Sequence, residues 1–253
     1  MTGASSGIGR AVALRLAAEG AQVLVHGRDA ARTEEVARLT GGSPLVADLA
    51  VPGSHGDLAD RALAVDGRID ILVAGAGAGW SGPFAGMGDG ELRRLVELDL
   101  VAPLALTRAV LPGMVARNCG QIVLVGSVAG RTGVAGEAVY AAAKAGLDAF
   151  AESLRLELVG SGVSVSVVVP GAVRTSFFDN RGRPYGRRFP RPVDPERVAA
   201  VTLDVVRHGR PEAWVPRWLA VAPSVRALAP RAFRRLSARF GEQVRSGGVE
   251  GPP

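Results

Sequence analysis

Three polar side chains near the middle of the chain have the types and spacing of a proton-transfer site. Tyr140 and Lys144 stand four residues apart in a segment with a helical pattern, so their side chains share one helix face, one turn apart. A phenol has a reference pKa of about 10, and a nearby ammonium group lowers that pKa. Ser127 stands thirteen residues before Tyr140, at the end of an apolar run, where it can hold a substrate oxygen. The three residues predict general acid–base chemistry on that oxygen.

A tyrosine and a lysine at this spacing usually form only a solvated helix face, which is the alternative for the motif taken alone. Composition favours the functional interpretation, because the chain has two tyrosines and Lys144 is its only lysine beside 29 arginines. An arginine does not easily replace this lysine, since its guanidinium group is bulkier and forked.

A glycine-rich turn opens the chain. The residues Thr2-Gly-Ala-Ser-Ser-Gly-Ile-Gly9 run directly into a helical pattern. Glycines at such a turn let the backbone approach a pyrophosphate, whose charge is favoured at a helix N-terminus. The turn therefore predicts a dinucleotide site, with a purely structural turn as the alternative.

The residues after the next apolar run bear on the choice of dinucleotide. A carboxylate at this place accepts the ribose 2′-hydroxyl of NAD, whereas an arginine pairs with the 2′-phosphate of NADP. Here Gly27 stands where the acceptor is expected and Arg28 follows it. We therefore expect NADP, with NAD as the alternative if Arg28 is only solvated and Asp29 only caps a helix. Asp48 follows the next run and can accept a bond from the adenine amino group.

Short apolar runs alternate with longer helical patterns along the chain. The runs are 21–25, 44–47, 69–73, 121–125, 163–169 and 213–215, and the helical patterns are 8–19, 30–39, 58–65, 91–114, 139–159 and 195–207. This alternation predicts an α/β fold: a single doubly wound, Rossmann-type domain with a parallel sheet flanked by helices. A buried strand normally precedes a glycine turn of this kind, yet only Met1 precedes Thr2, so the first strand is missing. Our hypothesis is a native start upstream of Met1; the alternative is a genuine truncation with weak folding and poor cofactor affinity.

Composition narrows the class of protein. The single cysteine, Cys119, fits a reducing cytosol, and the three histidines have no metal-binding spacing, so we expect no metal. Neither a secretory leader nor an apolar run of ~18 residues is present, which predicts a cytoplasmic protein.

Positive charge is concentrated in the last quarter of the chain. Residues 181–253 hold 15 arginines and 6 acidic residues, whereas residues 1–180 hold 15 basic and 18 acidic residues. We expect a dinucleotide-binding catalytic domain over 1–215 with a lid at about 175–195, a basic amphipathic extension over 216–245 and a disordered tail over 246–253. Three interpretations of the basic quarter stay open: packing against the domain or a sister subunit, a lid for a lipophilic ketone with peripheral membrane contact, and recognition of an acidic carrier protein or a coenzyme A thioester. Nucleic-acid binding is not expected, because aromatic and basic residues do not interleave on a strand.

These motifs together resemble the short-chain dehydrogenases/reductases, from Thr2 to about Val215. The glycine turn resembles the family's Thr-Gly-x-x-x-Gly-x-Gly, and Ser127, Tyr140 and Lys144 match its catalytic serine and Tyr-x-x-x-Lys pair. The resemblance implies a seven-stranded parallel sheet and assembly as a homodimer or homotetramer. It also implies a set of cofactor-binding residues: Gly3, Ser5, Ser6, Ile8, Arg28, Asp48, Leu49, Ala74, Gly75, Tyr140, Lys144, Pro170, Gly171, Val173 and Thr175.

Two departures from the family pattern bear on catalysis. Where the family reads Asn-Asn-Ala-Gly, residues 74–77 read Ala-Gly-Ala-Gly, so two side-chain amides are lost. Asp99 stands at the position of the family's fourth catalytic residue, an asparagine that places a water. An aspartate can still hold a water, but its charge favours the protonated lysine, so we expect turnover with a shifted pH optimum.

The sequence therefore predicts an NADP(H)-dependent oxidoreductase, a carbonyl reductase that interconverts a carbonyl and a secondary alcohol on a lipophilic small molecule. A 3-oxoacyl thioester reductase is the leading alternative substrate class. A catalytically impaired dinucleotide-binding protein is the alternative of a different class.

Overall fold

The computed structural model describes residues 1–186 and 190–240, so the expected tail lies outside the described residues. Six strands occur in the described part, and every pairing between them is parallel. They are β1 Leu24–Gly27, β2 Ser43–Val46, β3 Ile71–Ala74, β4 Gly120–Val125, β5 Val163–Pro170 and β6 Glu212–Val215. Five of the eight residues of β5 are valine and seven of the eight are buried, as expected for a central strand covered on both faces.

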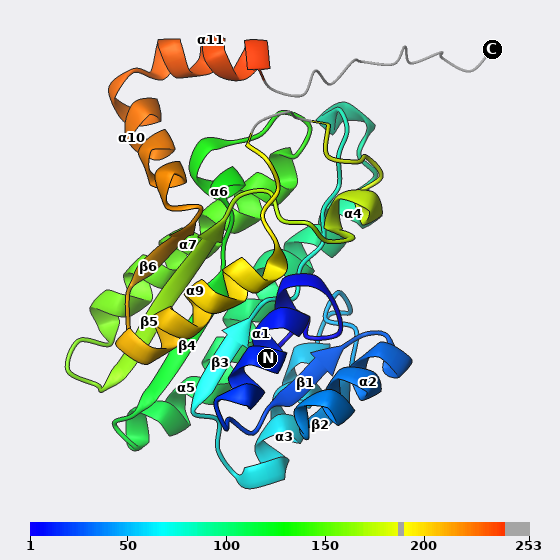
Figure 1. The fold of residues 1–253 in the computed structure, drawn as a ribbon, viewed down its shortest axis with the longest axis vertical. Coiled ribbons are helices and arrows are strands. Elements are labelled where there is room, and N and C mark those ends of the chain that lie inside the picture. Colours follow the sequence, from blue (N-terminus) through cyan, green and yellow to red (C-terminus); the bar gives the residue numbers. More distant parts are fainter. Residues whose placement is uncertain (187–189, 241–253) are drawn as a thin grey trace.

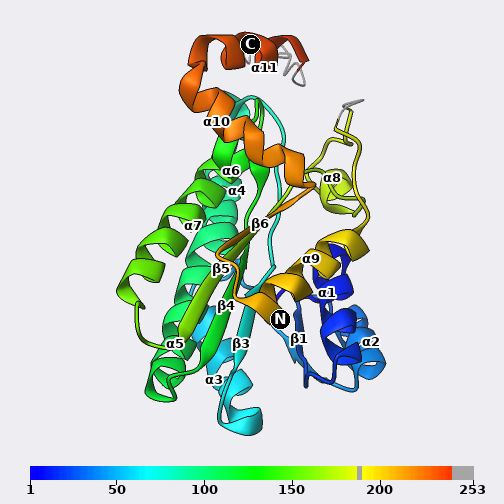
Figure 2. The ribbon, with the colours of Figure 1, turned by 60° about the vertical axis from the view of Figure 1, so that its left-hand side comes forward.

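Helices cover both faces of the strands, which confirms the doubly wound architecture (Figures 1 and 2). One face carries α1 Gly7–Ala18, α2 Ala30–Thr40 and α9 Pro195–His208. The other carries α3 Ser54–Asp66, α4 Asp89–Val96, α5 Ala102–Ala116 and α7 Ala138–Glu157. Each face has its own apolar core, centred on residues such as Val12 and Val198 on the first face and Leu106 and Leu147 on the second. The carboxyl ends of the strands, and the loops that follow them, therefore lie at one end of the domain.

The strands do not form the one seven-stranded sheet that the family resemblance implied. In the described residues they form a two-stranded sheet, β1-β2, and a four-stranded sheet, β3-β4-β5-β6. Residues 1–4 join the two sheets near their carboxyl ends: Thr2 N–H donates to Val73 O at 2.9 Å, and His26 N–H donates to Met1 O at 3.0 Å. Below that join, residues of both β1 and β3 line a cavity of about 490 Å³, among them Leu24, Ile71 and Leu72.

The helical segment expected over 91–114 is one long helix with a local change of pitch. α4 runs into a π-helical turn, Glu97–Val101, which continues as α5. By length and composition this helix, Asp89–Ala116, would be able to cross a membrane. Its apolar side, with Leu106, Val110 and Met114, is buried in the core beside the sheet. The π turn matters for the site, because it contains Asp99.

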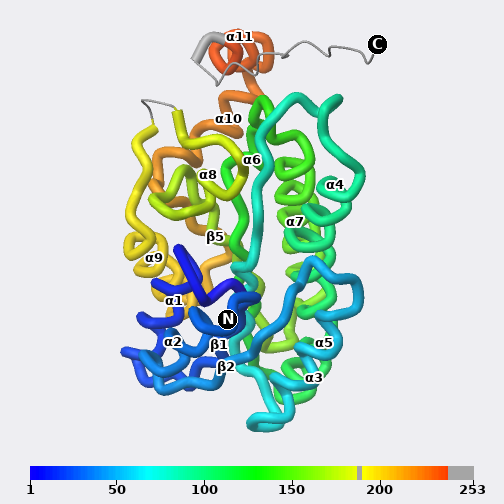
Figure 3. The backbone as a smooth tube through the Cα atoms, turned by 90° about the vertical axis from the view of Figure 1, so that its right-hand side faces the viewer, coloured from blue at the N-terminus to red at the C-terminus, as the bar shows by residue number. Residues whose placement is uncertain are grey.

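The chain after β6 leaves the domain core. A 3₁₀ turn, Arg217–Ala220, leads into α10 Val221–Leu228 and α11 Pro230–Phe240. These helices lie beyond the carboxyl ends of β4 and β5, at the same end as α6 Val128–Thr132 and α8 Phe177–Asn180 (Figures 1 and 2). In Figure 3 the segment with α8 and the segment leading into α4 lie on opposite sides of this end.

Candidate active site

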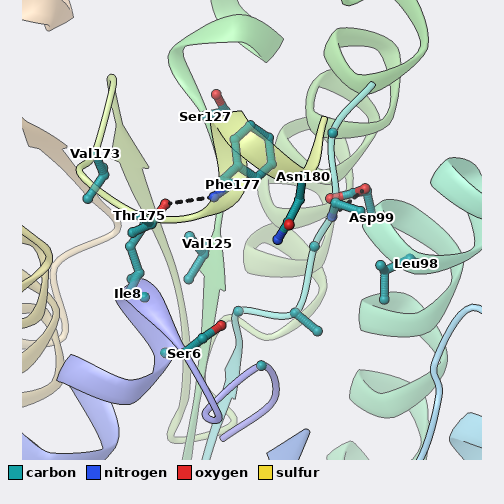
Figure 4. Close-up of a pocket in the computed structure, with 18 of the residues that line it drawn as sticks. Ser6, Ile8, Leu98, Asp99, Val125, Ser127, Val173, Thr175, Phe177 and Asn180 are labelled. Atoms are coloured by element: carbon teal, nitrogen blue, oxygen red, sulfur yellow. Dashed lines mark hydrogen bonds between the residues drawn. The ribbon is translucent and has the colours of Figure 1, made fainter. Parts of the chain in front are cut away.

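One cleft at the carboxyl ends of the strands collects nearly all of the predicted site residues. It is lined by the catalytic candidates Asp99, Ser127, Tyr140 and Lys144 and by Gly3, Ser5, Ser6, Ile8, Arg28, Asp48, Leu49, Gly75, Pro170, Gly171, Val173 and Thr175. Figure 4 shows the labelled members around the cleft, which come from the glycine turn, the end of β4, the loop after β5 and the α4–α5 helix. Ala74 is the exception, since it is buried at the end of β3 and does not line the cleft.

The turn before α1 has the shape that a bound phosphate group requires. Gly3 and Gly7 adopt positive φ angles of 67° and 52°, which favour glycine. A Cβ on Gly9 would lie 2.0 Å from Gly3 O, so that close crossing of backbone also needs glycine. Ser6 is the N-cap residue, its side chain makes no capping bond, and the first turn of α1 carries no acidic residue. The N–H groups at this helix end therefore face the cleft without a competing anion, and a pyrophosphate fits there.

His26 braces the glycine turn, a role that the sequence analysis missed. Its Nδ1 accepts from Gly3 N–H at 3.3 Å, and its Nε2 lies 3.1 Å from Ala47 O. Burial lowers the pKa of His26 to about 4, so the ring is neutral at pH 7 with its proton on Nε2. The available signal was a polar residue at the end of an apolar run, directly before Gly27.

The adenosine end of the cleft carries cations. A Cβ on Gly27 would lie 2.6 Å from Ser5 Oγ, so a larger side chain at this position would require Ser5 to move. Asp29 caps α2 by accepting from the backbone N–H of Arg32 at 3.0 Å, and it also accepts from Arg32 Nε at 3.0 Å. Arg28 is exposed and lines the cleft together with Arg32. Arg32 was not among the predicted residues, although its position one turn after Arg28 indicated it.

The three catalytic candidates meet at the other end of the cleft. Ser127 is the N-cap residue of α6, where its Oγ accepts from Ala129 N–H at 3.1 Å. It also shares a hydrogen bond with Tyr140 of α7. Lys144 Nζ lies 5.7 Å from the centroid of the Tyr140 ring. The serine, the phenol and the ammonium group are thus brought together as the spacing predicted.

Asp99 lies directly behind Lys144. Its Oδ1 is 3.1 Å from Lys144 Nζ, and its Oδ2 accepts from Ala78 N–H at 3.2 Å. A Cβ on Gly77 would lie 2.7 Å from Asp99 Oδ1, so the glycine makes room for the carboxylate. Lys144 also donates to Val125 O at 3.2 Å. Full burial raises the pKa of Asp99, and the positive charge of Lys144 opposes that rise.

The pKa of Tyr140 moves opposite to the direction expected from the Tyr–Lys spacing. Burial raises it most, the negative charge of Asp99 raises it further, and the hydrogen bond with Ser127 lowers it. The physical reason is that burial disfavours the charged phenolate, and that the negative charge of Asp99 disfavours it further. Tyr140 is therefore protonated at neutral pH, so this arrangement holds a proton donor.

Aromatic side chains of the lid region cover Tyr140. The Phe177 ring lies 5.4 Å from the Tyr140 ring, centroid to centroid, and the Phe177 and Phe178 centroids are 5.5 Å apart. Tyr185 extends the series at 4.8 Å from Phe178. Thr175 Oγ1 accepts from Phe177 N–H at 3.3 Å, which fixes the turn that carries the ring over the cleft (Figure 4). An apolar substrate finds matching contacts on this side.

A buried ion pair ties the lid to the loop before Tyr140. The Arg181 guanidinium group pairs with the Glu137 carboxylate, and these residues are only 4% and 9% exposed. Arg181 Nε also donates to Arg183 O at 2.9 Å, and its guanidinium carbon lies 4.7 Å from the Phe178 ring centroid. Neither Glu137 nor Arg181 was predicted as a site residue, because they are far apart in sequence and belong to no local motif.

With this geometry established, the comparisons with known proteins assign the family. The sequence profile of the family described as short chain dehydrogenase matches residues 1–185. The chain belongs to this family, whose members are NAD(P)-dependent oxidoreductases.

Individual relatives span different reactions. The chain is 38% identical over 179 residues to the 3-oxoacyl-[acyl-carrier-protein] reductase FabG of Salmonella typhimurium, an alignment that covers 70% of this chain and 73% of the relative. A short-chain dehydrogenase from Sphingobium yanoikuyae, solved with NADPH, is 30% identical with a TM-score of 0.81, and the match covers 98% of this chain and 96% of that one. A bulky-bulky ketone specific alcohol dehydrogenase from Comamonas testosteroni is 28% identical with a TM-score of 0.73, over 98% of this chain and 95% of that one.

Proposed function

We propose that this protein is an NADP(H)-dependent carbonyl reductase that interconverts a lipophilic ketone and its secondary alcohol. The observation that carries the proposal is the meeting of Ser127, Tyr140 and Lys144 in one cleft with the glycine turn of α1. That cleft can hold a dinucleotide at one end and a substrate oxygen at the other.

The residues divide the work of the reaction. NADPH, when bound, supplies the hydride for the carbonyl carbon. Ser127 Oγ holds the substrate oxygen, and Tyr140 donates the proton that this oxygen takes up. Lys144 lies next to the phenol, where it would hydrogen-bond the ribose of a bound cofactor, and Asp99 holds the lysine in place. The aromatic lid excludes water from the reacting groups.

The preference for NADP rests on the charges at the adenosine end. Arg28 and Arg32 line the cleft where a 2′-phosphate would lie, and Gly27 supplies no carboxylate to accept the ribose 2′-hydroxyl of NAD. The similar Sphingobium enzyme was solved with NADPH. In an Arg28→Ala/Arg32→Ala variant, we expect the KM for NADPH to rise at least tenfold and the KM for NADH to stay within twofold. Equal changes for the two cofactors would contradict this assignment.

The substrate proposal rests on the apolar roof of the cleft. Phe177, Phe178 and Tyr185 offer aromatic surface next to Tyr140, which suits a bulky ketone. A 3-oxoacyl thioester is the second candidate, because the Salmonella relative reduces a 3-oxoacyl group on a carrier protein. Comparing kcat/KM for aryl and alkyl ketones with that for 3-oxoacyl thioesters separates the two.

The decisive experiment follows NADPH oxidation with a panel of ketones for the parent protein and Tyr140→Phe. We expect the parent to turn over and the variant to lose at least 10³-fold in kcat while it binds NADPH unchanged. A parent protein that binds NADPH but reduces none of the panel would instead support the impaired, dinucleotide-binding alternative.

Assembly as a homodimer or homotetramer and a cytoplasmic location complete the proposal. The family resemblance supports assembly as an oligomer. The cytoplasmic location is supported by the free Cys119 and by the packing of the long helix Asp89–Ala116 against the sheet. Light scattering of the purified protein and cell fractionation test them.

A further inference from the structure

The two helices that leave the domain carry charge of one sign. Between Glu212 and Glu242 the chain has no acidic residue and six arginines: Arg217, Arg226, Arg231, Arg234, Arg235 and Arg239. Arg231, Arg234 and Arg235 are exposed on α11. A surface of this kind attracts an anionic partner at long range.

The same helices expose large apolar side chains. Val221, Val225 and Leu228 recur at helical spacing on α10 and are 60%, 38% and 88% exposed. Leu236 on α11 is 53% exposed. We call Val221, Val225, Leu228 and Leu236 the apolar ridge. Scattered exposed apolar residues are ordinary, but a ridge along two successive helices beside arginines is typical of an interfacial amphipathic segment.

The helices are fixed to the domain next to the lid. Arg226 Nη1 donates to Arg131 O at 2.8 Å, which ties α10 to α6, the helix that follows Ser127. Arg131 is itself paired with Asp148 and Glu212. α10 and α11 therefore stay at the end of the molecule where the lid and α8 lie (Figures 1 and 2).

We propose that α10 and α11 dock this protein on an anionic membrane surface, with the apolar ridge in the acyl boundary and the arginines of α11 on lipid phosphates. A second copy of the chain is a poorer partner, because a two-fold contact would bring the arginines of both copies together without counter-charges. An acidic protein would satisfy the arginines but would also need an apolar surface for the exposed valines and leucines, whereas an anionic bilayer offers phosphates and acyl chains together. Docking in this way turns the lid end of the cleft toward the lipid.

The test is co-sedimentation of the full chain with vesicles, in the presence of NADPH. One vesicle type is phosphatidylcholine alone, and the other contains about 30% phosphatidylglycerol, which gives its surface a negative potential. We expect binding to the anionic vesicles at least tenfold tighter than to the neutral ones, and weaker binding as salt is raised. Arg234→Ala/Arg235→Ala should weaken binding by more than about tenfold, and Leu228→Glu/Leu236→Glu should abolish it.

Leu156→Glu/Val159→Glu is the matched control. These side chains are 70% and 81% exposed, at and just beyond the carboxyl end of α7, and this variant should bind as the parent does. Binding of the parent protein to the two vesicle types can be compared without any variant. The proposal therefore stays testable even if a variant fails to fold. Equal binding to both vesicle types, or none, overturns the proposal. Two other results also overturn the proposal. In the first, the parent does not bind vesicles and Leu228→Glu/Leu236→Glu converts a dimer to a monomer. In the second, the parent binds an acyl carrier protein but does not bind vesicles.

Discussion

Two buried ion pairs flank Tyr140, and they are built from different parts of the molecule. The Asp99–Lys144 pair lies behind the ring and joins two core helices, the π turn after α4 and the middle of α7. The Glu137–Arg181 pair joins the residue just before α7 to the lid. Behind the ring, Ala78 N–H and Val125 O complete the pair with backbone contacts. The first pair belongs to the rigid core and the second to a segment that covers the cleft.

The two ion pairs are therefore expected to serve different purposes around the Tyr140 phenol. The core pair holds a charge at a fixed distance from Tyr140, which is what proton transfer requires. In our proposal the segment held by the Glu137–Arg181 pair is a lid over the substrate end of the cleft, so this pair would act on access and closure. We therefore expect substitutions behind the ring to change kcat and substitutions in front of it to change KM and stability.

The largest effect should come from the core pair. Lys144→Met removes the positive charge next to Tyr140, and we expect kcat to fall on the order of 10³-fold. Folding should suffer little, because burial raises the pKa of Asp99 and the carboxyl group can take up a proton when its partner is removed. Stopped-flow single turnovers and urea unfolding measure the two quantities. A variant that unfolds readily yet keeps its kcat would contradict the division of tasks.

The lid pair should show the reverse pattern. Arg181→Met removes the counter-charge from a buried carboxylate, and we expect a loss of about 3 kcal/mol in the free energy of unfolding and a KM raised roughly tenfold. Glu137→Leu/Arg181→Met should recover most of that stability, since no buried charge is then left. The control is Arg174→Met, whose exposed pair with Asp194 in the same segment should matter by less than about 1 kcal/mol.

The smallest and sharpest effect is on the pH dependence of alcohol oxidation, which needs the phenolate of Tyr140. The negative charge of Asp99 raises the pKa of Tyr140 more than that of Glu137 does. Asp99→Asn should therefore lower this pKa and move the rising limb of the oxidation profile to lower pH, by about one pH unit, and Glu137→Gln should move it less. Profiles that coincide with the parent's would show that neither carboxylate acts on the phenol.

The sequence predicted the parts of the site that local spacing determines. The glycine turn and the Tyr140–Lys144 pair are each confined to a few residues, so helix and turn geometry alone place their side chains. The strands were found from apolar runs, but β1 begins at Leu24, three residues later than expected, because its pairing with Ser43 sets the start.

The parts that depend on distant segments escaped prediction. Glu137 and Arg181 meet only because the lid folds back over the start of α7. The pKa of Tyr140 is raised mostly by burial in the folded protein and further by Asp99, which lies in a π turn that the sequence pattern did not predict. In the sequence His26 is an isolated polar residue. In the folded protein the pairing of β1 with β2 places it between Gly3 and Ala47.

The cofactor end and the catalytic end of the cleft belong to two different sheets, which residues 1–4 and a shared apolar core connect. Arg28 and Asp48 follow the two-stranded sheet, and Ser127 and Pro170 lie at the ends of strands in the four-stranded sheet. A dinucleotide lying along the cleft would contact residues that follow both sheets, so its binding would stabilise the two sheets together. A ligand at a concentration of a hundred times its Kd raises the free energy of unfolding of the protein that binds it by about 2.7 kcal/mol. Slowed amide exchange in β1 and β2 would be its signature here.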